Sequence, residues 1–423
     1  MPVPHRIDDF LFYGCELDPE VVGLPETLQT DPPAETYHAD VSELTARATN
    51  LLHTILSERV ATLDAGTQHI IPLSSGLDSR ILLEALLEHV RAEQVTTVSY
   101  GSPGTWDFEI PRAIANEVGV DHRRIDLTSQ QTEWSLSALE AHTATLDIGQ
   151  NVFESYPNSL PAERVDAERS IIWSGFYGAL TGGKLMRNRP TSWETAQQYF
   201  LEWNKSTDSS LLSTEYTPES ALPAEPWLPA ETLGYDLQLN LGVRQQCNTG
   251  PGVIYDPELY ETPYTDDRWI RFWCRVPREY RQDRSLIESV FYNVCRHSRA
   301  YPSDGNYGSP ISRNSYFALA CGVSKVLYAR AKATLFDGVH YPDPHENYVN
   351  YGAAFRSDER FRKIGYEALS SLDERGLFEQ DVTDRWETHL QNGGLGKEIQ
   401  LLISLELFLR VENGNQEPSV VRA

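Results

Sequence analysis

Between residues 69 and 174, short apolar segments alternate with helical patterns, and this alternation limits the possible folds more than any other feature. A short apolar strand is predicted at 69–73, and the alternating, β-branched segment 95–100 predicts a second. Residues 123–127, after a helix that ends at Gly119, and 170–174 are predicted as the third and fourth strands. Apolar residues at helical spacing predict helices at 41–62, 79–90 and 108–118, and a further one near 157–168. Strands separated by helices favour an α/β fold, in which a parallel sheet carries helices on both faces. Such sheets bind ligands beyond the carboxyl ends of their strands.

The pattern changes after Pro190. Residues 205–235 are rich in serine, proline and glutamate, and long helical patterns follow at 281–298, 314–335, 357–373 and 395–411. We therefore predict three regions along the chain. They are an irregular lead-in at 1–40, a parallel-sheet domain at 41–190 and a mainly helical region at 191–423 that packs on it.

The charge of the chain narrows the classes of function. Among its 423 residues, 61 are acidic and 36 are basic, which gives a net charge of −25. Only six of the basic residues are lysines, and 30 are arginines. Such an acidic surface is typical of halophilic proteins, because molar salt shortens the Debye length to about 3 Å and screens the self-repulsion. No basic stripe is present to neutralise phosphates, so a nucleic-acid partner is disfavoured.

The N-terminus and the cysteines give no sign of export. Asp8 and Asp9 stand where a signal peptide would begin its apolar core, and no segment has the length and apolarity of a membrane span. We therefore expect a cytoplasmic protein with no membrane partner. The five cysteines form no C-x-x-C pair, so we expect buried free thiols rather than disulfides or zinc ligands.

The turn between the first predicted strand and the next helix, S-S-G-L-D-S at 74–79, has the composition of an anion site. The free N–H groups of such a turn and the helix dipole both favour negative charge, and the serine hydroxyls add donors. Asp78 beside phosphates makes sense as a Mg²⁺ ligand. The alternative is that Asp78 and Ser79 only cap the helix.

Two other kinds of active site match parts of the sequence. Ser74 occupies the nucleophile position of a G-x-S-x-G turn, although Pro72 replaces the first glycine that allows the sharp bend. Residues 178–184 match the G-x-x-x-x-G-K of a Walker loop, although Leu185 stands where Ser or Thr must hold Mg²⁺. Each departure removes a group that the chemistry needs, so both alternatives are disfavoured.

Four segments, in order along the chain, resemble the asparagine synthetase family of ATP pyrophosphatases. L-S-S-G-L-D-S at 73–79 is similar to the family's L-S-G-G-L-D-S loop, and 98–127 is similar to its second strand, helix and third strand. W-S-G-F-Y-G-A-L-T-G-G at 173–183 stands where the family has S-G-E-G-A-D-E-L-F-G-G, and 261–277 is similar to its P-F-x-D segment. The resemblance implies a Rossmann-like sheet domain with a helical remainder. It also implies that a substrate carboxylate attacks ATP, and that an amine then captures the acyl group.

The resemblance further implies a site for ATP and Mg²⁺. Pyrophosphate and Mg²⁺ would be bound by Ser74, Ser75, Gly76, Asp78 and Ser79, with Asp78 as the metal ligand and a catalytic residue. Adenine would contact the main chain of Leu73, Ser99 and Tyr100, and the ribose would lie near Ser174 and Gly175. Asp107 and Asp266 match acidic positions of the family, although either could be a structural cap. The family's catalytic lysine has no clear counterpart, and its role could fall to Arg281, Arg284 or Lys184.

Departures from the family pattern limit what can be expected. Ser75 replaces the first glycine of the loop, which is tolerable if φ is negative there. Phe176 and Tyr177 stand where the family has the glutamate that helps deprotonate the amine, and the segment is one residue short. Formation of asparagine itself is therefore in doubt.

The nitrogen source is also open. The family's glutaminase domain needs a cysteine directly after the initiator Met, but Pro2 follows here, and the 68 residues before the first strand are too few for that domain. Ammonia would come free or from a separate glutaminase, or another amine would replace it. Our leading hypothesis is an ATP-dependent ligase that joins a small-molecule carboxylate to ammonia or an amine. The alternatives are a degenerate, non-catalytic nucleotide-binding partner protein and, less favoured without paired cysteines, an enzyme that transfers sulfur to tRNA.

Overall fold

The computed structural model describes most of the chain. The described residues are 4–17, 30, 31, 33, 35–146, 149–161, 169–176, 178, 183, 190–207, 211–226, 259–306, 309–311, 348–378, 382–392 and 396–415, with single residues and short stretches between 316 and 331. The predicted helix at 314–335 therefore lies mostly outside the described residues, as do Tyr177, Lys184 and residues 162–168.

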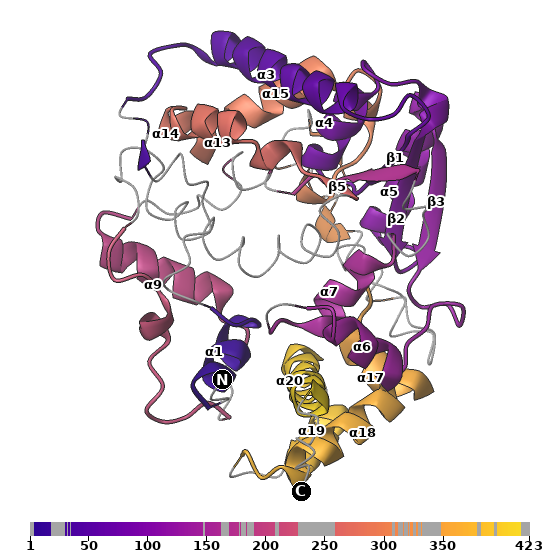
Figure 1. The fold of residues 1–423 in the computed structure, drawn as a ribbon, viewed down its shortest axis with the longest axis vertical. Helices are drawn as coiled ribbons and strands as arrows, with labels where there is room; N and C mark the ends of the chain where they lie inside the picture. Colours follow the sequence, from indigo (N-terminus) through magenta and orange to yellow (C-terminus); the bar gives the residue numbers. More distant parts are fainter. Residues whose placement is uncertain are drawn as a thin grey trace, which may run out of the picture.

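A five-stranded parallel sheet forms the centre of the fold, as predicted (Figure 1). Its strands, in the order β3-β2-β1-β4-β5, are β1 (Gln68–Pro72), β2 (Val95–Gly101), β3 (Asp121–Asp126), β4 (Ser170–Trp173) and β5 (Tyr260–Glu261). The chain crosses from one side of β1 to the other between β3 and β4. A doubly wound sheet forms its ligand crevice at such a reversal, here at the carboxyl ends of β1 and β4.

Side chains alternate between two hydrophobic cores, one on each face of the sheet. Ile71 and Trp173 belong to one core, while their neighbours Ile70 and Ile172 belong to the other, as the two-residue period of a strand requires. The first core is covered by α3 (Val41–Ala61), α4 (Leu77–Leu86), α5 (Trp106–Val118), α13 (Asp267–Cys274) and α15 (Ser285–Val294). The second is covered by α6 (Leu136–Thr143), α7 (Val152–Ser159), α17 (Tyr351–Ser357), α18 (Glu359–Glu374), α19 (Val382–Asn392) and α20 (Gly396–Asn415).

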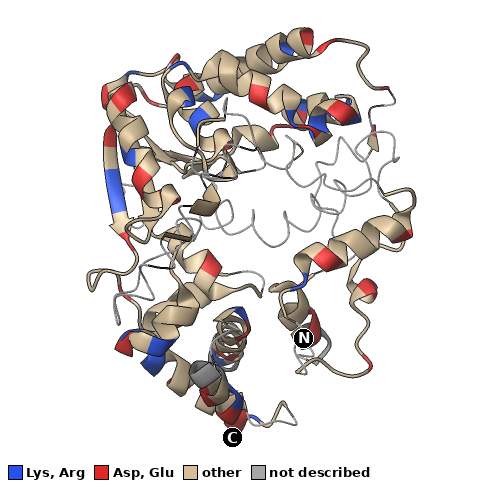
Figure 2. Cartoon of the chain, turned by 180° about the vertical axis from the view of Figure 1, so that it is seen from behind, with Lys and Arg blue, Asp and Glu red and all other residues tan. Residues whose placement is uncertain are grey.

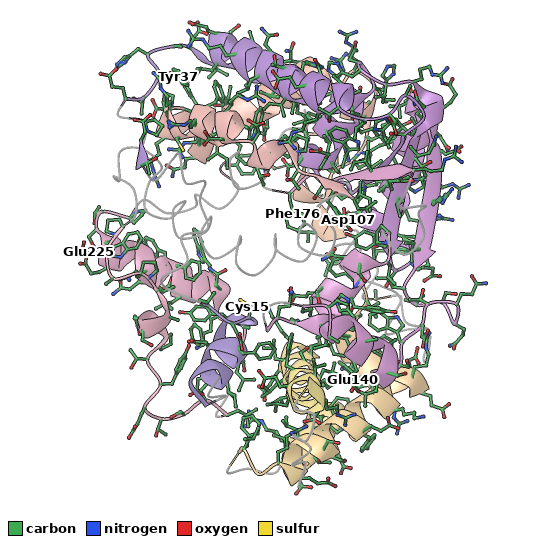
Figure 3. The ribbon with its side chains drawn as sticks, viewed as in Figure 1. Cys15, Tyr37, Asp107, Glu140, Phe176 and Glu225 are labelled. Atoms are coloured by element: carbon green, nitrogen blue, oxygen red, sulfur yellow. The ribbon has the colours of Figure 1, made fainter. Side chains whose placement is uncertain are left out.

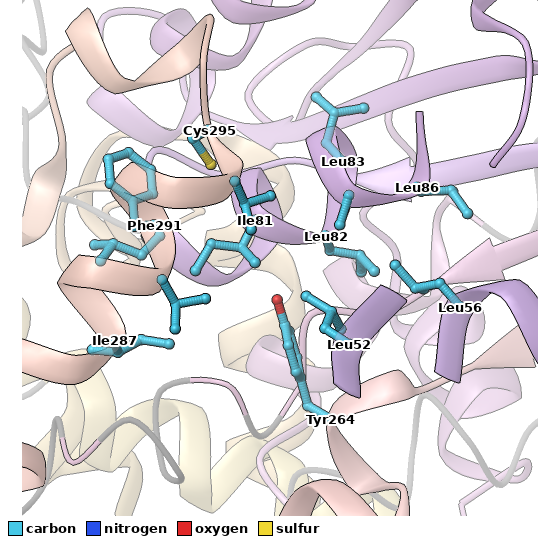
Figure 4. Packing of buried hydrophobic residues seen from close by; sticks show 14 of the residues in the cluster. Leu52, Leu56, Ile81, Leu82, Leu83, Leu86, Tyr264, Ile287, Phe291 and Cys295 are labelled. Atoms are coloured by element: carbon cyan, nitrogen blue, oxygen red, sulfur yellow. The ribbon is translucent and has the colours of Figure 1, made fainter. Parts of the chain in front are cut away.

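Helix α4 is the central element of the first core. Figure 4 shows its residues Ile81, Leu82, Leu83 and Leu86 between the helices α3 and α15. All residues of α4 except Asp78 are buried, which explains the leucine-rich sequence, since a helix that is surrounded on every side is mostly apolar. The carboxyl end of β1 and the N-terminus of α4 are thereby fixed relative to the rest of the sheet.

Two expectations about helices are wrong. The lead-in at 1–40 is not entirely irregular, because α1 (Pro4–Tyr13) forms there and its Phe10 and Leu11 pack into the second core. The predicted helix at 281–298 is two helices, α14 (Arg278–Gln282) and α15. The helix is interrupted at Arg284, which has the left-handed φ of 63°. The Asp283 carboxylate accepts a hydrogen bond from the Ser285 N–H at 2.8 Å, at the start of α15.

The predicted elements of the sheet domain are confirmed with small shifts of their ends. The helix expected at 79–90 runs over 77–86. The helix expected near 157–168 is the exception and stays a prediction, because α7 (Val152–Ser159) ends at Ser159 and residues 162–168 lie outside the described part of the chain. Gly119, with a φ of 78°, ends α5 in the left-handed conformation that glycine adopts readily. The small unit of α1, α9 (Trp193–Asn204) and the turn Pro218–Ala221 has a third core of its own.

Charged residues lie on the outer surface of the helices and on the exposed edge of the sheet (Figure 2). Edge strand β3 exposes Asp121, Arg123 and Arg124, and charges of this kind protect an edge from pairing with other chains. Cys15, Cys274 and Cys295 are buried free thiols, as expected. No helix within the described part of the chain is long and apolar enough to cross a membrane.

Candidate functional site

The loop at 74–79 runs from the end of β1 into the first turn of α4, at the crevice of the sheet. Gly76 is the N-cap of α4, has a φ of −73° and forms no side-chain cap, so neither Asp78 nor Ser79 takes the cap position. The Ser79 hydroxyl instead accepts from the Ser74 N–H at 3.1 Å, and the Ser74 hydroxyl accepts from the Gly76 N–H at 3.1 Å. Two backbone N–H groups and two hydroxyls thus meet within one short loop, which is a suitable donor set for a phosphate oxygen.

Asp107, the second residue of α5, holds the middle of this loop. Its Oδ1 accepts from the Ser75 N–H at 2.8 Å and from the Ser75 hydroxyl at 2.6 Å. Ser75 is fully buried, and among the described residues only Arg284 and Tyr348 combine a side chain with a positive φ. The serine that replaces the expected glycine is therefore unstrained, and its hydroxyl serves as a tie to Asp107.

Arg80 fixes the loop from behind. This arginine is fully buried, and its guanidinium donates to the Ser75 carbonyl at 2.7 Å and to the carbonyls of Ser298, Tyr301 and Pro302. Burial lowers its pKa to about 10, so it keeps its charge at neutral pH. A cation bound to the Ser75 carbonyl polarises the peptide that carries the Gly76 N–H and makes that group a stronger donor.

Glu84 lies one turn after Arg80 on α4 and holds the same segment. Its carboxylate accepts from the N–H groups of Arg296, His297 and Ser298 at 2.7, 3.0 and 2.8 Å. The two buried charges of α4 therefore bind both the carbonyls and the N–H groups of residues 296–302. Sequence reasoning missed this pair. The signal was available, as two opposite charges four residues apart within a helix that is otherwise apolar.

The segment after β4 lies against the N-terminus of α4. A Cβ atom on Gly175 would be 3.3 Å from the Ser79 N, and one on Gly178 would be 2.6 Å from the Asp78 Cγ. Gly183, with a φ of 80°, lies so close to the Arg281 carbonyl that a Cβ atom would overlap it. Glycine at 178 is thus required for the approach to Asp78, and at 183 for the contact with α14.

Tyr264 and Asp266 belong to the fourth matching segment, 261–277, and have structural contacts. The Tyr264 hydroxyl donates to the Asp78 carbonyl at 2.9 Å. Burial, and to a smaller extent the nearby charge of Asp78, raises the pKa of Tyr264. Asp266 caps α13 through the Arg268 N–H at 3.0 Å. Although burial raises the pKa of Asp266, hydrogen bonds from Arg268 and the charges of Arg268 and Arg59 outweigh it and lower the pKa. Of the two readings left open for Asp266, the structure favours the cap.

A cleft opens beside the loop, beyond the carboxyl ends of β1 and β2. It has a cavity volume of about 150 Å³, and its lining residues are Pro72, Leu73, Ser74, Tyr100, Asp107 and Tyr348. Figure 3 labels Asp107 together with Phe176, which follows β4. Phe176 packs against the first hydrophobic core and brings no acid or base to this region.

The remaining residues expected at the site have these positions. The Ser99 hydroxyl points away from the cleft, at 3.2 Å from His122 Nε2, so only its main chain could face a ligand. The Ser174 hydroxyl accepts from the Phe176 N–H at 3.3 Å. Arg281 is fully buried in α14. Burial raises the pKa of the Cys274 thiol, and the positive charge of Arg281 partly offsets this increase. Lys184 lies outside the described residues.

The alternative readings gain no support from these contacts. In the described hydrogen bonds, the Ser74 hydroxyl meets Ser79 and Gly76 and no histidine, so a hydrolase base is missing there. Most of the Walker-like segment 178–184 lies outside the described residues, so that reading stays a prediction. The described groups form a loop rich in hydrogen-bond donors, with two acidic side chains, Asp78 and Asp107, and a cleft beside it.

Comparison with known proteins agrees with this architecture. Residues 54–226 match the model of the asparagine synthase family, so the chain contains an asparagine synthase domain and the expected resemblance is confirmed. A stretch of 120 residues is 29% identical to a 7-cyano-7-deazaguanine synthase from Staphylococcus saprophyticus, and the match covers 28% of this chain and 49% of that protein. The chain thus spans about half the length of the curated relative. The five-stranded parallel sheet with its helical C-terminal region is consistent with the Rossmann-like fold of the adenine nucleotide alpha hydrolases.

Proposed function

We propose that the asparagine synthase domain of this chain is an ATP-dependent ligase, which adenylates a small-molecule carboxylate and joins the acyl group to ammonia or another amine. The observation that carries the proposal is the meeting of three separate segments at Asp78. The loop at 74–79 supplies the residue, Gly178 approaches its carboxylate, and Tyr264 binds its carbonyl. These segments are the ones whose sequences match the family, and they meet at the crevice of the sheet, where nucleotides bind in this kind of fold.

The reaction has two balanced steps. A carboxylate oxygen attacks the α-phosphorus of ATP, the bond to the bridging oxygen of the β-phosphate breaks, and pyrophosphate leaves with that electron pair. A nitrogen lone pair then attacks the acyl carbon, AMP leaves, and the nitrogen loses one proton. In this proposal the N–H groups and hydroxyls of residues 74–79 hold the pyrophosphate, and the carboxyl-end cleft holds the AMP portion. Such donors are most useful where charge develops on the leaving group.

Asp78 is suited to hold Mg²⁺ together with the phosphates. In the described part of the chain no group of three or more acidic, histidine or cysteine side chains could hold a metal, but Mg²⁺ on a nucleotide needs only one or two carboxylates, since phosphates and waters supply the other ligands. Gly178 packs directly against the carboxylate, where a Cβ atom would be 2.6 Å from the Asp78 Cγ and would displace it. When bound, the ion would neutralise charge on the phosphates.

The replacement of the family's glutamate by Phe176 bears on the second step. An apolar ring offers no oxygen to take a proton from an ammonium group. The proposed enzyme would therefore use an amine, or ammonia, that is already neutral at the working pH. This predicts that the rate of amide formation increases with pH toward the pKa of the amine, whereas the rate of adenylation does not.

The experiment is a measurement of AMP and pyrophosphate release from Mg-ATP, with a panel of carboxylates and ammonia, at KCl concentrations up to several molar. Wild-type protein should release both products in equal amounts with at least one carboxylate. Asp78→Asn, and Gly178→Ala through displacement of the Asp78 side chain, should each reduce release by more than tenfold.

Two control variants match these changes. Asp64→Asn removes an exposed aspartate before β1, and Gly66→Ala adds a methyl group that meets nothing within 4 Å. Both should release AMP like the wild type. Full turnover by Asp78→Asn would contradict the assignment of this site.

A non-catalytic nucleotide-binding protein is the second candidate, and the replacement at Phe176 favours it. It would bind ATP or AMP tightly at the same loop and release no pyrophosphate with any carboxylate. Calorimetric binding without turnover across the panel would favour it over the ligase.

A further inference from the structure

Tyr348 reaches the candidate nucleotide cleft from the C-terminal region of the chain, far in sequence from the other residues that line it. Its φ is 64°, a left-handed conformation that costs energy for any residue with a bulky side chain. The Ser102 hydroxyl, just after β2, donates to its carbonyl at 2.6 Å. Backbone strain held in place by a specific tie is a reason to look for a function of the side chain.

The ring of Tyr348 is paired with that of Tyr100 at the end of β2. The two rings are stacked, with centroids 5.7 Å apart and planes 8° apart. Both hydroxyls donate to the Asn158 Oδ1, at 2.7 Å from Tyr100 and 3.2 Å from Tyr348. Asn158 is itself fixed, because its Nδ2 donates to the Glu154 carbonyl at 2.9 Å.

We propose that Tyr348 is a specificity-determining residue of the nucleotide cleft, where it forms with Tyr100 an aromatic wall that selects a purine base. This inference rests on the proposed function and adds a residue from the C-terminal region to its site. The cleft begins at Ser74, in the loop proposed for the phosphates, and continues to the two rings, so the part of the nucleotide beyond the phosphates would lie against them.

The chemistry of the wall favours stacking over hydrogen bonding. The two hydroxyls already donate to Asn158, and burial raises the pKa of Tyr348 to about 12 and that of Tyr100 as well, so both stay neutral. Pro72 and Leu73 supply an apolar surface in the same cleft. A site of this kind distinguishes bases by their area of contact, which is larger for a purine than for a pyrimidine.

The test compares the binding of Mg-ATP and Mg-CTP, measured by calorimetry, to wild-type protein, Tyr348→Gly and Tyr348→Phe. Glycine adopts the left-handed conformation without strain, so Tyr348→Gly removes the ring and keeps the backbone. We expect it to weaken ATP binding about tenfold and CTP binding much less, because loss of one stacking ring commonly costs that much. Tyr348→Phe keeps the ring and should keep the preference for ATP. Tyr348→Asn, which also tolerates this conformation, should behave like Tyr348→Gly and replaces it if the glycine variant does not fold.

The outcomes separate this inference from the proposed function. If wild-type protein binds ATP, and the folded glycine or asparagine variant keeps the wild-type ratio of ATP to CTP affinity, Tyr348 does not read the base and this inference alone is overturned. If wild-type protein binds neither nucleotide, the proposed function is overturned and this inference with it.

Discussion

The bond between Ser75 and Asp107 can be tested in isolation, and it decides whether the loop is a fixed structure before any ligand binds. The perturbation is a double-mutant cycle of Ser75→Ala, Asp107→Ala and both together. Ser75 donates to the same Asp107 oxygen through its hydroxyl at 2.6 Å and its N–H at 2.8 Å. The hydroxyl is the part of this contact that the cycle isolates.

The expected sizes follow from these contacts. A hydrogen bond to a charged group contributes about 1.5 to 3 kcal/mol, so Ser75→Ala should lower the free energy of unfolding by about 2 kcal/mol. Asp107→Ala leaves both donors of a buried residue without this acceptor and should cost about 3 to 4 kcal/mol. In the double variant the hydroxyl is absent, so only the N–H of residue 75 lacks the Asp107 acceptor. The loss of unfolding free energy in the double variant should therefore be about 1.5 to 2 kcal/mol smaller than the sum of the losses in the two single variants.

The assay is urea unfolding at one fixed KCl concentration, followed by tryptophan fluorescence and by circular dichroism. A coupling energy below about 0.5 kcal/mol would refute the reasoning, because residues that do not interact show additive effects within that limit. Such a result would mean that the loop is held mainly by Arg80 and α4. The same variants should weaken the binding of Mg-ATP in the order of their effect on stability.

Two further predictions concern buried charges and histidines. Glu84→Ala should lower the free energy of unfolding by about 3 to 5 kcal/mol, because it leaves the N–H groups of Arg296, His297 and Ser298 without this acceptor and removes a negative charge that favours the charged form of Arg80. Glu88 is exposed, so Glu88→Ala should change it by less than about 0.5 kcal/mol, and urea unfolding of both variants tests this. Burial lowers the pKa of His69, His122 and His142 to about 4, with the charges of Arg124 and Arg112 also contributing at His122. Below pH 6.5 the unfolded chain binds protons that the folded protein does not, so the free energy of unfolding should fall between pH 6.5 and pH 4. His142 alone accounts for up to about 3 kcal/mol of this fall. The free energy of unfolding of His142→Asn should therefore depend less on pH than that of the wild type, and an equal dependence would contradict this contribution of His142.

The sheet was predictable because its signals are local. A short apolar strand and an apolar period in the next helix are each contained within a few residues, and the parallel arrangement follows from their alternation. The exceptions depend on distant contacts. Helix α1 forms where proline and aspartate suggested an irregular segment, because Phe10 and Leu11 pack on the C-terminal helices. The break at Arg284 is a different case, because S-L-I-E at 285–288 has the spacing of a helix start, a local signal that apolar periodicity does not detect.

The candidate site was predictable to the extent that it is contiguous. Ser74, Gly76, Asp78 and Ser79 follow one another in a loop whose chemistry can be read directly from the sequence. Tyr348 could not be found in this way, because the chain between it and Tyr100 includes most of the protein and periodicity does not report such a contact. The hydrogen bond between Ser75 and Asp107 joins residues 32 positions apart, so the sequence indicates each residue separately but not the contact between them.

The most direct test of the central claim is a crystal structure of the protein with Mg²⁺ and α,β-methylene-ATP. We predict that the β- and γ-phosphates lie within about 3 Å of backbone N–H groups in residues 74–79, and that the base lies in the cleft beside Leu73 and Tyr100. A triphosphate bound elsewhere on the molecule, with residues 74–79 still closed on their own serine hydroxyls, would contradict the account.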